Sequence, residues 1–155
     1  MKNKIALSTL VASTLLLSSQ AGAVQQSGTA NFNLVYPITV TENTAMEFGD
    51  IDITSDGSCV LDYADGTSGT NCVAGGATAA SGDFTITAAD GNVTVSLSAA
   101  DTSVAGVTFT PSVASPTVGI TANTANLKVG GTVAVVAASA TAGAHALTYT
   151  VDVIY

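Results

Sequence analysis

Residue types that perform chemistry are scarce and scattered in this chain. His145 is the single histidine, and no Gly-x-Ser-x-Gly sequence supplies a nucleophile for it. Eleven carboxylates leave a glycosidase-type acid pair formally open, but four Tyr, four Phe and no Trp offer few rings to stack on a sugar. No Gly-rich phosphate loop with a lysine occurs. We therefore predict that the protein is not an enzyme and uses no cofactor.

One acidic cluster offers oxygen atoms of the kind that calcium binds. Asp50, Asp52 and Asp56 are weak calcium candidates, and Asp62 and Asp65 follow them closely. Their spacing does not match the helix-loop-helix calcium pattern, because no Glu closes the loop. The alternative is a solvated acidic turn, which Asp and Gly favour through turn chemistry alone.

The two cysteines, Cys59 and Cys72, predict one disulfide bond. The loop that they close, residues 59–72, is rich in turn residues, and closing a loop of this length contributes roughly 3 kcal/mol by the chain-entropy estimate. Zinc is disfavoured, because no further Cys or His stands near either cysteine.

The N-terminus has the pattern of an export signal. Lys2 and Lys4 precede the apolar stretch 5–17, and Ala21-Gly-Ala23 fits the small-x-small cleavage pattern, so we expect residues 1–23 to be removed. A transmembrane anchor is the alternative, but the stretch is shorter than the ~20 residues that a span needs. The expected location is secreted, in the periplasm or on the bacterial cell surface, with no membrane span after cleavage.

Removal of that segment leaves a strongly acidic chain. Residues 24–155 hold Lys128 alone against eleven acids, a net charge of −10. Nucleic-acid binding is excluded as a function, because neutralising phosphates requires Lys and Arg. Ion pairs cannot hold the fold together, so apolar burial and backbone hydrogen bonds must do so.

Apolar and polar residues alternate along most of the chain, which is typical of β-strands. We predict a single all-β domain over residues 24–155, an immunoglobulin-like antiparallel β-sandwich of about eight or nine short strands. The expected strands are residues 29–40, 46–53 with an irregularity at Gly49, 84–88, 93–97, 104–110, 118–127, 132–138 and 145–155. A loop with Pro111 and Pro116 is expected to separate two of them.

The edges of such a sandwich lack the usual protection, because one Lys and three Pro are all that the chain has for blunting them. An exposed edge can accept an extended segment from a neighbour. The candidate donor strand is residues 24–40, in which alternate residues are apolar: Phe32, Leu34, Tyr36, Ile38 and Val40. The alternative is that this segment is the first strand of its own sheet.

Several short motifs resemble a family of small secreted bacterial proteins. They are Pro37-Ile-Thr-Val, Met46-Glu-Phe-Gly, Gly82-Asp-Phe-Thr-Ile-Thr, Leu127-Lys-Val-Gly-Gly and the C-terminal Leu147-Thr-Tyr-Thr-Val-Asp-Val-Ile-Tyr155. The family is catalogued as a domain of unknown function and is similar to fimbrial (pilin) major subunits and spore-coat-U-like proteins. The resemblance implies an immunoglobulin-like sandwich at a bacterial surface, with Tyr149 and Tyr155 on an aromatic-bearing last strand. The chain departs from usher pilins in its internal disulfide.

Two functions follow as hypotheses. The first is a pilin-like structural subunit of a bacterial surface fibre, assembled by β-strand addition, with residues 147–155 forming one wall of the receiving groove or the core beneath it. The second is a secreted adhesin or carbohydrate-binding module, stabilised by calcium. Expected partners are further copies of the chain, other surface subunits and a periplasmic chaperone.

Overall fold

The computed structural model describes residues 24–155, and the export signal predicted over residues 1–23 lies outside this part of the chain. Residues 24–33 belong to one unit and contain no strand, while a second, compact unit covers Leu34–Tyr155. The described residues contain strands and no helix, which confirms the all-β prediction. Consequently, no helix in this part of the chain could cross a membrane.

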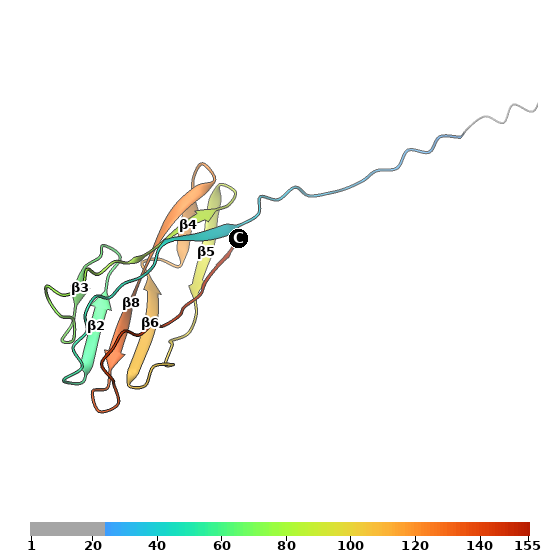
Figure 1. Cartoon of the computed structure of the whole chain (residues 1–155). Coiled ribbons are helices and arrows are strands. Elements are labelled where there is room, and N and C mark those ends of the chain that lie inside the picture. Colours follow the sequence, from blue (N-terminus) through green and yellow to red (C-terminus); the bar gives the residue numbers. More distant parts are fainter. Residues whose placement is uncertain (1–23) are drawn as a thin grey trace, which may run out of the picture. The chain divides into compact units, whose positions relative to one another are not determined.

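Nine strands of the described chain form two antiparallel sheets (Figure 1). Their bounds are β1 (Thr39–Thr44), β2 (Gly57–Leu61), β3 (Thr67–Ser68), β4 (Gly82–Thr87), β5 (Gly91–Leu97), β6 (Val107–Val113), β7 (Thr117–Ile120), β8 (Thr124–Val135) and β9 (Val151–Ile154). The first sheet has the order β1-β4-β8-β2-β3, with β6 also paired to β8. The second sheet has the order β7-β5-β9.

The long strand β8 organises the first sheet. Its first half pairs with β4, and its second half is flanked by β2 on one edge and β6 on the other, as Figure 1 shows. Two glycines mark the change of partner. Gly131 lies opposite both Leu61 and Pro111, and a Cβ on Gly130 would collide with the carbonyl oxygen of Leu61. The close approach of β2 therefore requires glycine here.

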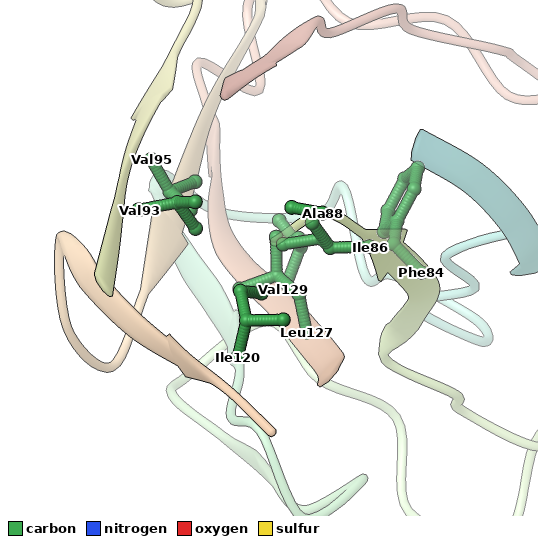
Figure 2. Close-up of a cluster of buried hydrophobic side chains, with 8 residues drawn as sticks. All are labelled: Phe84, Ile86, Ala88, Val93, Val95, Ile120, Leu127 and Val129. Atoms are coloured by element: carbon green, nitrogen blue, oxygen red, sulfur yellow. The ribbon is translucent and has the colours of Figure 1, made fainter. Parts of the chain in front are cut away.

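The first core cluster fills the space between the two sheets. Inward-facing residues of β4 and of the first half of β8 pack against those of β5 and β7, because alternate residues of each strand point to the same side. The cluster, drawn in Figure 2, consists of Phe84, Ile86, Ala88, Val93, Val95, Ile120, Leu127 and Val129. Burial on this scale provides the main stabilising free energy of a domain with so few charges.

A smaller second cluster lies on the other half of the first sheet. Phe109 of β6 and Val133 and Val135 of β8 are buried there. No strand of the second sheet covers these three residues. Side chains from residues 46–53 and 140–149, which lie outside the nine strands, pack against them instead.

The predicted first strand, residues 29–40, is wrong over residues 29–38. The strand begins only at Thr39, which lies opposite Thr87, the last residue of β4. The chain turns into β5 beyond Thr87, so β4 offers no backbone to pair with residues before Thr39. The actual strand, β1, continues to Thr44 instead.

Two further expected strands form only in part. Residues 46–53 make the isolated bridges Glu47–Ala80 and Ile51–Cys72, and the irregularity expected at Gly49 is a positive φ of 75°. Of residues 145–155, only Val151–Ile154 form a strand, because Val151 lies opposite Leu97, where β5 ends.

The structure also differs from the expected strands in the middle of the chain. Pro111 lies inside β6 rather than in a loop. The expected strand 118–127 is a hairpin, in which Ala122 and Asn123 adopt positive φ and separate β7 from β8. The cysteine-bearing strand β2 was not predicted, although the Cys59–Cys72 disulfide is confirmed.

We expect Gly130→Ala to destabilise the fold by about 1–3 kcal/mol, because the added methyl group forces β2 away from β8. Urea unfolding measures the change. Gly119→Ala is the matched control, since a Cβ there makes only an ordinary contact with Asn92 and should alter stability by less than about 0.5 kcal/mol. Equal effects of the two substitutions would contradict this description of β8.

Candidate functional site

A cleft of about 900 Å³ lies over the second core cluster. Its floor consists of Val107 and Phe109 of β6 and Val133 and Val135 of β8. Its walls come from residues 45–53 and 141–149. Its walls carry the apolar side chains of Met46, Phe48, Ile51, Ile53, Leu147 and Tyr149, while polar atoms contribute about as much of its surface as apolar ones.

The cleft exists because the second sheet ends before the first one does. Beyond β5, the Ser98 amide donates to the Thr150 carbonyl at 3.1 Å, and the chain then leaves the second sheet. The backbone of Asp101 exchanges two hydrogen bonds of 2.8 Å with Phe109, on β6 of the first sheet. This crossing leaves residues 145–149 without a β-ladder, and β9 is an edge strand whose second edge is unpaired in its sheet.

Tyr149 marks the boundary between the two core clusters. Its ring makes edge-to-face contacts with Phe84 and Phe109, with centroids 6.1 and 5.8 Å apart. Its hydroxyl is buried and has no hydrogen-bond partner among the described residues, and a side chain on Gly82 would displace it. Burial, followed by the nearby charge of Glu42, raises the pKa of Tyr149 to about 12. The phenol is therefore neutral at ordinary pH.

Acidic residues surround the opening of the cleft. Glu42, Glu47 and Asp50 line it, while the single lysine of the described chain, Lys128, pairs with Asp83 at 3.1 Å. Glu42 lies on the same face of the edge strand β1 as Val40, opposite the buried Phe84, and lines the cleft while staying exposed to solvent. A charge on an edge strand opposes random edge pairing. The cleft therefore disfavours an anionic occupant.

One carboxylate fixes the wall formed by residues 141–149. The Asp101 side chain accepts hydrogen bonds of 2.8 Å from the amide of Thr148 and the amide of Ser103. These bonds, that of Thr148 first, lower the pKa of Asp101 to about 2. Because Asp101 is also bridged to β6, it links the wall to the floor of the cleft.

The predicted donor residues fall into two groups. Ile38 and Val40 pack against the first core cluster, and Val40 pairs with Ile86 of β4, so neither is free for a neighbour. Phe32 and Leu34 are 80% and 87% exposed and lie outside the strands. Tyr36 is less exposed, at 47%, and its carbonyl accepts a hydrogen bond from the Tyr155 hydroxyl at 2.6 Å.

The calcium candidates Asp50, Asp52 and Asp56 do not converge. Asp50 accepts a hydrogen bond from the amide of Ala77, and Asp56 accepts one from the amide of Ala137. Asp52 accepts hydrogen bonds from the amide and the hydroxyl of Thr54, and these bonds lower the pKa of Asp52. No group of three potential metal ligands occurs within residues 24–155. Asp52 thus caps a local turn, the alternative considered from the sequence, whereas Asp50 and Asp56 each accept an amide from a distant part of the chain.

The sequence did not identify the floor of the cleft or Asp101 as parts of a site. The floor residues were expected only as strand residues, and their exposure to a cleft depends on where the second sheet ends. The Asp101-Thr-Ser103 sequence does favour a turn in which the carboxylate accepts a local amide, but its second bond, to Thr148, spans 47 residues.

Comparison of the chain with family models, curated proteins and solved structures found no match. The resemblance to secreted pilin-like proteins is therefore carried by the sequence motifs alone.

Asp101→Asn should reduce the loss of stability in acid. Because folding lowers the pKa of Asp101 from 3.8 to about 2, its carboxylate stabilises the fold above about pH 4, and this contribution disappears as the pH falls toward 2. We expect the variant to be less stable than the parent at pH 7, with a smaller difference at pH 2.5. Urea unfolding at both values tests this, with the exposed Asp152→Asn as control; a constant difference at the two pH values would contradict the assignment.

Proposed function

We propose that the protein is an exported structural subunit that joins copies of itself by β-strand addition, as in a pilin-like surface fibre. The observation that carries the proposal is the presence, in one chain, of a cleft with an apolar floor beside an unpaired strand edge, and of an alternating apolar segment that forms no strand. The unpaired edge can provide backbone hydrogen bonds for the segment, and the segment can provide apolar side chains for the cleft.

The occupant that we assign to the cleft is residues 28–34 of a second copy. Gly28, Ala30, Phe32 and Leu34 alternate along this segment, so all four can face the floor while the backbone pairs with residues 145–149. The five residues of that wall extend over about 16 Å, which corresponds to a donor stretch of similar length. The side chains of Ile38 and Val40 stay in their own core.

Charge supports the same occupant. Residues 24–41 contain no charged residue, and residues 24–38 form no strand. This segment of a second copy can therefore pass Glu42, Glu47 and Asp50 without like-charge repulsion.

An added strand would lengthen the second sheet over the half of the first one that only residues 46–53 and 140–149 cover. The result would be a sandwich covered along its whole length, which is the immunoglobulin-like arrangement expected from the sequence. Donor and acceptor are different surfaces, so the contact is head-to-tail and does not close on a dimer. An open chain of subunits is the assembly that such contacts produce, and the cell surface is its proposed location.

Leu34→Asp should abolish assembly, because it places a carboxylate on the apolar floor of an acid-rimmed cleft. Burial of an unpaired charge costs several kcal/mol, so we expect association to weaken roughly a hundredfold or more. Sedimentation and electron microscopy of the secreted chain, residues 24–155, provide the measurement.

Val35→Asp is the matched control, since it adds the same charge on the opposite face of the donor segment. It should retain most of the assembly. Equal loss in the two variants, or a parent protein that stays monomeric at every concentration, would refute the proposed function.

A further inference from the structure

The C-terminal residue holds the base of the donor segment. The Tyr155 hydroxyl accepts the Ala89 amide at 3.1 Å and donates to the Tyr36 carbonyl at 2.6 Å. Ala89 follows β4 at the end of the sandwich where Thr87 lies opposite Thr124, the first residue of β8. The cleft floor contains Val133 and Val135, at the other end of β8. The donor segment is therefore tied down at the end away from the cleft.

The length of the chain limits what a tied segment can reach. Two chain segments, which include β1 and β9, lead from the Tyr155–Tyr36 hydrogen bond toward the cleft. Following them, the first residue that lines the cleft is Glu42, six residues after Tyr36, or Tyr149, six residues before Tyr155. Six extended residues span about 20 Å. Phe32 is four residues from Tyr36 and can lie at most about 14 Å from it, and Leu34 only about 7 Å. With Tyr36 held, the large side chains of Phe32 and Leu34 therefore stop short of the cleft of their own molecule, and only the small residues Gly28 and Ala30 could extend that far.

Release of Tyr36 changes this limit. Without that hydrogen bond, the first residue whose backbone is fixed is Thr39, where β1 begins to pair with β4. Thr39 lies three residues, or about 10 Å, from Glu42 at the cleft. Phe32 is seven residues from Thr39 and could then extend up to about 24 Å, enough to fold back. We infer that Tyr155 is a positioning residue that prevents the donor segment from entering its own cleft and so directs it to a second copy. This inference rests on the proposed function of the cleft.

Tyr155→Phe tests the inference, because it removes both hydrogen bonds and keeps the ring. One net hydrogen bond shifts an equilibrium by between about two- and tenfold, so we expect assembly to weaken by that factor. Tyr63→Phe is the matched control, since the Tyr63 hydroxyl is 3.5 Å from Ser112 on another part of the chain.

The deciding readout is chymotrypsin cleavage after Phe32 and Leu34 in the monomer fraction, located by mass spectrometry. Parent and Tyr63→Phe monomers should be cut readily, whereas Tyr155→Phe monomers should be protected because the segment lies in their own cleft. Simple loss of stability would speed cleavage rather than slow it. Equal or faster cleavage of Tyr155→Phe overturns the inference, whereas a parent that does not assemble overturns the proposed function instead.

Discussion

The early end of the second sheet is the constraint on which the rest of the structure depends. The chain leaves that sheet after Leu97 and joins β6 at Asp101, so a sandwich that is covered at the β4 end is uncovered at the β2 and β6 end. Phe109, Val133 and Val135 would face water there if residues 46–53 and 140–149 did not pack over them. Residues 46–53 and 140–149 take part in few β-ladder pairs. Their unpaired backbone therefore lies beside the cleft.

The charge composition shapes how the chain holds itself together. With Lys128 as the only lysine of residues 24–155 and no arginine, carboxylates act mainly as acceptors for backbone amides. Asp101 joins Ser103 to Thr148, and Asp65 accepts both the amide and the hydroxyl of Ser81. These bonds join loops that are distant in the chain. The uniform negative sign of the carboxylates makes much of the surface repulsive to a second copy. Residues 24–37, which are uncharged and exposed throughout, do not share in this repulsion.

Period-two alternation predicted the fold class, because it reflects burial on one face of a strand. It failed where alternation has a different cause. Residues 29–38 alternate without a partner strand, and residues 145–149 alternate because Leu147 and Tyr149 pack onto the second cluster without a ladder. Separate strands were expected at 118–127 and 132–138, but β8 runs through Gly130 and Gly131, which allow β2 and β6 to approach it closely. The cleft itself depends on where distant segments stop pairing, such as Leu97 with Val151, and a single sequence carries no local signal for this.

Amide hydrogen exchange of residues 24–155, compared between dilute and concentrated samples, tests most directly whether an incomplete sandwich is completed by a neighbour. We predict that residues 28–34 and 145–149, apart from the Thr148 amide whose hydrogen bond Asp101 already accepts, exchange rapidly when dilute and gain protection together as concentration rises, because the same hydrogen bonds protect both. Protection of the two segments that is independent of concentration, or protection of one without the other, would contradict the account.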